Sequence, residues 1–186
     1  MHFRRFIFFI FLVLNLYCPC QAQSSSIEID DRLSVRLSSP FSIALETLQG
    51  LIEYNFTDIG LLRRAMTHSS YSEENNRALS ILGESVIETW VSLRQLTKDI
   101  DVSPQDLNTL ISEVSEVETS CAVDGMKLKL QNIVRVSPKT DPSTPSVVCG
   151  AFRAMFGAIA VDTGKADVGG SKFGSVHEKF GRARAV

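Results

Sequence analysis

Hydrophobic side chains recur at steps of three and four residues over much of the chain, which is the spacing of an amphipathic helix. Pro40 opens the first such stretch, with an apolar stripe of Phe41, Ala44, Leu45, Leu48, Leu51 and Ile52. Asp58 is placed to cap a second helix, from Ile59 to Thr67. The longest stripe predicts a third helix buried on a broad front, through Leu79, Ile81, Leu82, Val86, Ile87, Trp90 and Leu93. The pattern favours an all-α fold.

The second half of the chain continues in helical periods. Ser103, Pro104 and Asp106 form a strong helix start, and the apolar stripe behind them runs to about Gly125 through Leu107, Leu110, Ile111, Val114, Val117 and Cys121. Between Ser137 and Ser146 an exposed loop is predicted from Pro138, Pro142 and Pro145. A last core helix over about 147–162 should end at Gly164. Its small residues would let another helix approach closely: Gly150, Ala154, Gly157 and Ala158.

The N-terminal residues are typical of a secretory signal peptide. Arg4 and Arg5 precede an apolar run from Phe6 to Tyr17, and the small residues Cys20 and Ala22 suit cleavage after residue 22. We therefore expect the chain to enter the endoplasmic reticulum lumen or to be secreted, with no membrane contact after cleavage. An uncleaved anchor is one alternative, although the run is short of the roughly 20 residues that span a bilayer. An organelle transit peptide is the other.

The composition of the remaining residues predicts a lead-in, one domain and a C-terminal tail. Residues 23–38 are Ser-rich and predict a flexible lead-in, and residues 39–164 form one domain of ordinary globular composition. Residues 165–186 are expected to be a loosely ordered, Gly-containing basic tail, with Lys172, Lys179, Arg182 and Arg184. Loss of Arg4 and Arg5 with the leader changes the net charge from −2 to −4. Strong binding to a nucleic-acid backbone usually needs a basic excess, so that charge argues against it.

Two further features depend on the compartment. Once the leader has removed Cys18 and Cys20, Cys121 and Cys149 remain, and they are either a disulfide or two buried thiols. Asn55 begins an Asn-Phe-Thr glycosylation sequon, which is usable only in the secretory pathway.

Three stretches, in their order and separations, resemble the ribonuclease III domain over residues 41–164. They are Tyr54–Phe56 with Leu61–Tyr71, Asn76–Leu79 with Leu82–Val86, and Phe152–Ala154 with Gly157–Ile159 and Asp162–Gly164. The resemblance implies a single, all-α ribonuclease III-like endonuclease domain and a link to RNA processing. A single short domain behind a leader is also similar to plant members of the family that are linked to karyogamy, the fusion of nuclei, including the polar nuclei, in reproduction.

Ribonuclease III enzymes cut double-stranded RNA with magnesium ions held by carboxylates. The resemblance places the four ligand carboxylates at Ser80, Glu84, Gly150 and Arg153, and a further family acid at Arg77. Only Glu84 is acidic, and it is one methylene longer than the usual Asp. We therefore expect no metal or other cofactor, with Glu84 as the residual candidate ligand, paired with Arg153 or Arg77.

These residues leave three hypotheses for function. The first is a catalytically degenerate module that forms a homodimer through the signature helix around Ile81 and Val86, or binds a partner, with weak or no binding of double-stranded RNA. The second is an active, Mg-dependent endoribonuclease that recruits Glu73, Glu74 or Glu88. The third is a luminal structural or interaction protein. His68 could serve as a general base, but the resemblance assigns it to a structural turn.

Overall fold

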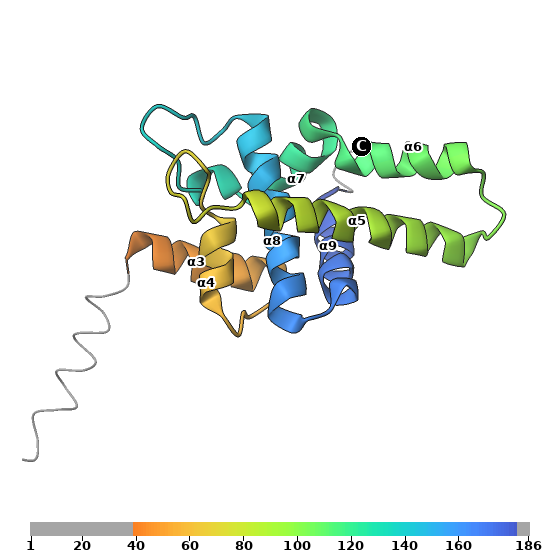
Figure 1. Ribbon diagram of the computed structural model, residues 1–186, viewed down its shortest axis with the longest axis horizontal. Coiled ribbons are helices and arrows are strands. Elements are labelled where there is room, and N and C mark those ends of the chain that lie inside the picture. The colour runs from red at the N-terminus through yellow and green to blue at the C-terminus, as the bar shows by residue number, and fades with distance from the viewer. Residues whose placement is uncertain (1–38, 182–186) are drawn as a thin grey trace, which may run out of the picture. The chain divides into compact units, whose positions relative to one another are not determined.

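The computed structural model describes residues 39–181, so the predicted signal peptide, the lead-in and the last five residues lie outside it. Every regular element in this range is a helix, as the sequence pattern predicts (Figure 1). In chain order they are α3 (Pro40–Ile52), α4 (Ile59–Ala65), α5 (Arg77–Lys98), α6 (Pro104–Ser115), the π-turn η1 (Val117–Cys121), α7 (Ala122–Lys127), the 3-10 turn η2 (Leu130–Asn132), α8 (Pro145–Thr163) and α9 (Ala166–Gly181).

Helix α8 is the centre of the core. It contacts α4, α5, α7 and α9, and its side chains from Val147 to Ala160 are almost all buried. In length and hydropathy α8 would suffice to cross a bilayer, but 67% of its apolar segment is covered by the rest of the protein. Helix α8 therefore has the burial of a core helix. It begins earlier than predicted, because Pro145 occupies its first turn. Proline is tolerated there, since the amides of the first turn have no partner within the helix. It ends at Gly164, whose φ of 67° suits a residue without a Cβ.

Helix α4 begins as predicted and ends two residues early. The Asp58 carboxylate accepts a hydrogen bond from the amide of Gly60 at 2.8 Å, which caps the helix. Thr67 does not extend it, because this residue forms a parallel bridge with Arg135. The amide of Arg135 donates to the Met66 carbonyl at 3.0 Å, and this bridge ties the first helices to the segment after η2.

The prediction that α5 is buried on a broad front is wrong for part of its stripe. Leu79, Val86 and Ile87 are buried, whereas Ile81 is 69% exposed, Leu93 62% and Leu82 37%. Helix α5 packs on α8 and α9 along one side and then continues beside α6, as a hairpin that projects beyond them (Figure 1). Within residues 39–181, these apolar side chains of α5 are thus left without cover.

The predicted helix from Ser103 to about Gly125 is broken. Ser103 caps α6 as expected, but α6 ends at Ser115, and Glu116 has an extended backbone with φ −61° and ψ 126°. The chain turns there into η1, which carries Cys121 to α8. A straight helix would have carried Cys121 along the axis of α6 instead. A stripe of apolar residues cannot reveal such a break, because both sides of it keep the helical spacing.

The predicted loose tail is a helix over residues 166–181. Phe173 and Val176 of α9 are buried in the core, and Trp90 of α5 meets Phe173 edge to face, with ring centroids 5.5 Å apart. The glycines that suggested disorder allow this packing. A Cβ on Gly170 would lie 2.7 Å from the Trp90 Cβ, and one on Gly174 would overlap the indole ring. The buried Asp124 of α7 also accepts a hydrogen bond from His177 of α9, at 2.6 Å.

Candidate functional site

The site expected from the sequence lies where α5 crosses α8, and two glycines set that crossing. A Cβ built on Gly83 would overlap the carbonyl oxygen of Arg153, and one on Gly157 would lie 2.9 Å from the Gly83 amide nitrogen. The two backbones are therefore in direct contact, which only glycine permits on both helices. Because Glu84 follows Gly83, this contact brings it beside Arg153.

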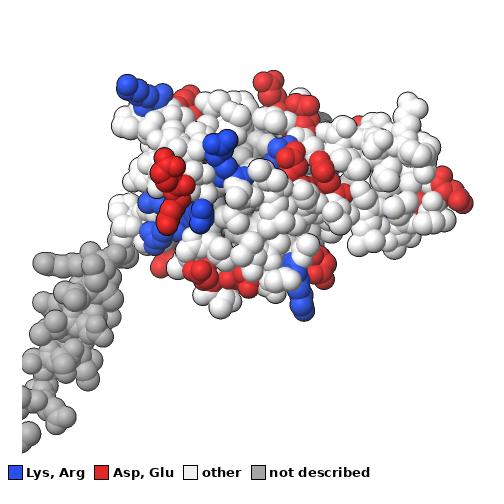
Figure 2. All heavy atoms as spheres, in the orientation of Figure 1, with Lys and Arg blue, Asp and Glu red and all other residues white. Residues whose placement is uncertain are grey.

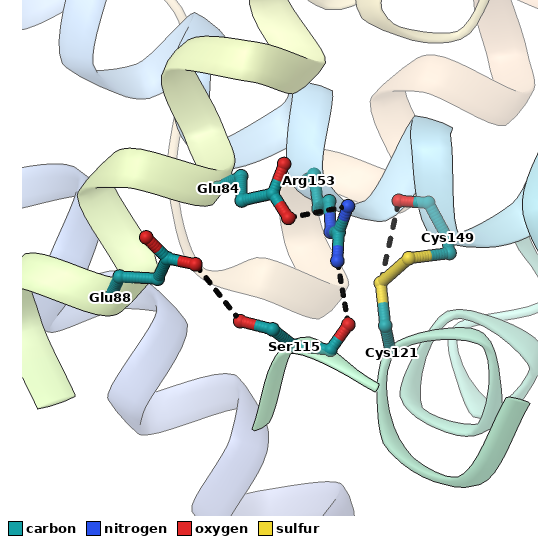
Figure 3. The surroundings of a disulfide bond; sticks show 6 residues. All are labelled: Glu84, Glu88, Ser115, Cys121, Cys149 and Arg153. Atoms are coloured by element: carbon teal, nitrogen blue, oxygen red, sulfur yellow. Dashed lines mark hydrogen bonds and ion pairs between the residues drawn. A yellow bond between two sulfur atoms is a disulfide. The ribbon is translucent and has the colours of Figure 1, made fainter. Parts of the chain in front are cut away.

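Glu84 and Arg153 form an ion pair, with Arg153 Nη1 2.9 Å from Glu84 Oε1 (Figure 3). The Arg153 side chain is 15% exposed and that of Glu84 37%. Arg153 Nη2 donates a second hydrogen bond, of 2.6 Å, to the carbonyl oxygen of Ser115. The guanidinium thus links α5, the end of α6 and α8, in a position where the family resemblance implies a carboxylate.

The other positions implied by the resemblance lie around this pair. Ser80 is half-buried one turn before Glu84 on α5, and Gly150 lies one turn before Arg153 on α8, so each shares a helix face with its neighbour. Arg77 is exposed at the start of α5, and Glu84 pairs with Arg153. With one Glu and one Arg among them, the formal charge over the four ligand positions is zero.

Of the acids considered as substitute ligands, Glu88 lies one turn after Glu84 on the same face of α5 (Figure 3). Glu88 accepts a hydrogen bond of 3.4 Å from the Ser115 hydroxyl, and Glu73 and Glu74 are exposed in the segment before α5. Across residues 39–181, no group of three or more His, Cys, Asp or Glu side chains is close enough to hold a metal ion.

His68 lies in a tight turn between α4 and α5, in which the Tyr71 amide donates to the His68 carbonyl oxygen at 2.9 Å. Its amide donates to the Arg135 carbonyl at 2.9 Å, and its Nδ1 accepts from the Ser70 amide at 3.1 Å. Ser70 Oγ lies 2.9 Å from the same nitrogen. These bonds hold the turn between α4 and α5.

Sequence reasoning missed the part that Ser115 plays. Its carbonyl oxygen is free to accept from Arg153 because the chain leaves the helical path at Glu116. A disulfide between Cys121 and Cys149 joins η1 to α8 beside this turn (Figure 3). The sequence allowed either a disulfide or two buried thiols at these cysteines, and the structure contains the disulfide. No signal in the residues around 115 predicted the break.

The decisive comparison is with a sequence family. Residues 58–171 match the family described as Ribonuclease-III-like. The chain belongs to this family. Among its relatives, Protein NUCLEAR FUSION DEFECTIVE 2 of Arabidopsis thaliana is 57% identical over 140 residues, which cover 75% of this chain and 73% of the relative.

Bacterial members of the family are more distant. Ribonuclease 3 of Thiobacillus denitrificans is 31% identical over 121 residues, and the match covers 63% of this chain and 53% of the bacterial protein. The chain therefore spans about half the length of such a ribonuclease 3. The nuclease domain of ribonuclease III from Campylobacter jejuni has the same fold, with a TM-score of 0.68 and 26% identity over 73% of this chain and 97% of that domain.

Proposed function

We propose that this ribonuclease III-like chain is a non-cutting module that acts as a homodimer. The observation that carries the first part is the ion pair between Arg153 and Glu84. A two-metal mechanism concentrates carboxylates so that one ion generates hydroxide and the other stabilises the leaving oxygen. Here a permanently charged guanidinium stands among the ligand positions and neutralises the one acid that remains.

The residues present do not fit a pair of magnesium ions. Magnesium demands nearly octahedral oxygen coordination, and the family positions supply a single carboxylate, which Arg153 already engages. Ser80 could offer a neutral hydroxyl, and Gly150 has no side chain. We therefore derive no hydrolytic step for this chain.

The test of this part is an RNA cleavage assay. Purified chain without its leader is incubated with magnesium and long double-stranded RNA, and ribonuclease III from Campylobacter jejuni serves as the positive control. We expect the RNA to stay intact. Magnesium-dependent cutting that is abolished by Glu84→Ala, or by alanine at Glu73, Glu74 or Glu88, would overturn the proposal. Cutting that survives all four substitutions would point to a contaminating nuclease.

The second part rests on the apolar side chains that α5 leaves exposed. Ile81 and Leu93 are exposed on this helix, and a groove of about 460 Å³ between α5 and α9 is lined by Val86, Trp90, Leu93 and Ala166 among others. We assign a second copy of this chain as the occupant. The description of the Campylobacter jejuni structure refers to a flexible region of that nuclease domain that is involved in dimer formation. A related domain that forms dimers supports the proposal of a dimer here.

Light scattering tests the dimer. The parent chain should have twice the monomer mass. The double variant Ile81→Glu, Leu93→Glu should have the monomer mass, because burial of an unpaired carboxylate in an interface is unfavourable. Ile43→Glu is the matched control, since Ile43 is 51% exposed on α3, outside the proposed interface, and should leave the dimer unchanged. A monomeric parent chain would refute the dimer and leave the cleavage result as it stands.

Binding of double-stranded RNA is proposed to be weak. On the face in Figure 2, Lys and Arg side chains are interspersed with Asp and Glu instead of forming one basic field. Phosphate contacts supply much of the affinity of RNA-binding proteins and weaken steeply with salt. Any retention of RNA should therefore disappear as the salt concentration rises.

By its likeness to the Arabidopsis protein, we further propose a role in fusion of nuclei. Expression of this chain in plants that lack NUCLEAR FUSION DEFECTIVE 2 should restore fusion. The Glu84→Gln variant should restore it equally if cutting is not needed. Rescue by the parent chain alone would argue for a catalytic role.

A further inference from the structure

The loop between α3 and α4 alternates buried and exposed side chains. Tyr54 and Phe56 are half-buried and pack against the core, with their rings edge to face and centroids 4.8 Å apart. Asn55 and Thr57 are exposed. This is the period of two that an extended segment has, and it places these two side chains on the outside of the loop.

The loop is held in this conformation from both sides. The Tyr54 hydroxyl donates to Asp162 Oδ2 at 2.6 Å, and the amide of Thr57 donates to the same oxygen at 2.9 Å. The Phe56 amide donates to Gln49 Oε1 at 2.8 Å. The Asn55 side chain, by contrast, takes part in none of the hydrogen bonds or ion pairs of residues 39–181, so a substituent on its amide nitrogen would break no contact.

Asn55-Phe56-Thr57 is the only Asn-X-Ser/Thr triplet in the whole sequence. The middle residue is not proline, and the hydroxyl residue stands two places after the asparagine, as the sequon requires. Chance alone produces such triplets in buried helices as often as in loops. Here the triplet lies in an exposed loop, and the Asn55 side chain has no hydrogen-bond or ion-pair partner among residues 39–181.

The disulfide supplies an independent indication of compartment. Disulfides persist in the secretory pathway and outside cells and are rare in the cytosol, and Cys121 is joined to Cys149. The leader at residues 1–22 indicates the same route. Both the glycan donor and the oxidising conditions are found in that compartment.

We infer that Asn55 carries an N-linked glycan. In the transfer, the Asn55 amide nitrogen forms a bond to the first sugar of a lipid-linked oligosaccharide. The bond between that sugar and the lipid pyrophosphate breaks, the pyrophosphate leaves, and the amide loses one proton. The inference rests on the secretory route that residues 1–22 predict and does not depend on whether the chain cuts RNA or dimerises.

The glycan would stand clear of the site described above. The loop is tied to Asp162, nine residues after Arg153 on α8, which is roughly 14 Å along the helix axis at 1.5 Å per residue. The ion pair and the RNA assay should therefore be the same with and without the sugar.

The experiment compares four chains secreted by cultured human cells: the parent, Asn55→Gln, Thr57→Ala and Thr57→Ser. Each is made once with its own residues 1–22 and once with a known cleavable signal in their place. Peptide N-glycosidase F should shift the parent and Thr57→Ser downward by the mass of one glycan and convert Asn55 to Asp in the digested peptide. Asn55→Gln and Thr57→Ala should already run at the lower mass. Thr57→Ala keeps the amide that bonds Asp162 but loses the hydroxyl that also bonds it, whereas Thr57→Ser keeps both contacts.

Each outcome decides the inference. Unmodified parent chain in the medium, from both leaders, would show that Asn55 is not used. Glycan with the replacement leader alone would show that the chain's own leader does not deliver it, which would overturn the inference for the natural protein. Asn108→Gln, at an exposed asparagine outside any sequon, is the control and should keep the glycan.

Discussion

Gly83 and Gly157 lie in contact where α5 crosses α8, and a Cβ on either would collide with the backbone of the other helix. The closeness of this crossing brings the Glu84 carboxylate within reach of the Arg153 guanidinium. The geometry of the whole site therefore depends on two residues that have no side chain.

Alanine at either crossing glycine should be costly. Gly157→Ala must push α5 and α8 apart, and overpacking of this kind costs about 1–3 kcal/mol of unfolding free energy, or more where backbone is the obstacle. Gly150→Ala is the matched control on the same helix. Its Cβ would meet nothing within 4 Å, so the better helix propensity of alanine should stabilise the protein by up to about 1 kcal/mol. Urea denaturation measures both changes, and equal effects would contradict the close crossing.

Substitution of Arg153 should destabilise the protein more than substitution of Glu84. Glu84→Gln removes a charge that is over a third exposed and screened by water, so the loss should be under about 1 kcal/mol. Arg153→Met removes the ion pair and also leaves the Ser115 carbonyl without its donor, so about 2 kcal/mol is expected. A double-mutant cycle gives the coupling between the two residues. Equal losses from the two single variants would show that the Ser115 bond contributes nothing.

The disulfide between Cys121 and Cys149 should stabilise the fold substantially. It closes a loop with a sequence separation of 28, for which the chain-entropy account gives about 3–4 kcal/mol. A reductant should therefore lower the urea midpoint of the chain without its leader. The double variant Cys121→Ala, Cys149→Ala should start at the lower midpoint and not respond to reductant. A parent chain indifferent to reductant would mean that the bond is not formed.

Tyr54 should ionise late. Burial, and then its hydrogen bond to Asp162, raise the pKa of its phenol from 10.0 to about 12. Burial raises the pKa of Asp162 too, but hydrogen bonds from Tyr54 and from the Asp58 and Thr57 amides outweigh it, so that pKa is lowered overall. In a Tyr71→Phe chain without its leader, Tyr54 is the only tyrosine. The absorbance of its phenolate should therefore appear near pH 12 in the native protein and near pH 10 in denaturant.

The sign of the stability change follows from these shifts. A phenol whose folded pKa is raised stabilises the fold fully below pH 10, and the contribution is lost as the pH rises towards 12, because the unfolded chain ionises first. Asp162 has a lowered folded pKa, so its contribution is present at neutral pH and is lost as the pH falls through that lowered value. Tyr54→Phe should flatten the alkaline fall. An unchanged alkaline slope would contradict the assignment to Tyr54.

Periodicity alone predicted most of the helices, because burial of one face imposes the spacing of apolar residues directly. Periodicity did not predict features that depend on which elements pack against each other. Gly170 and Gly174 suggested a loosely ordered tail, yet they make room for Trp90, which lies 80 and 84 residues earlier in the sequence. The same limit explains Ile81 and Leu93, since an apolar stripe does not say whether its cover comes from the same chain. The pairing of Glu84 with Arg153 could be predicted because the resemblance placed both residues at one site. The resemblance assigned no role to Ser115, so its hydrogen bond to Arg153 could not be predicted.

The central position of α8 also determines when the chain can fold. Helices α4, α5 and α7 precede α8 and pack on it, and α9, which follows, closes the core with Phe173. During synthesis the first hundred residues of the domain must therefore wait, with their apolar faces exposed, until the chain has been made to about residue 181. We therefore expect the segment around Asn55 to be accessible during that interval to enzymes that act on nascent chains.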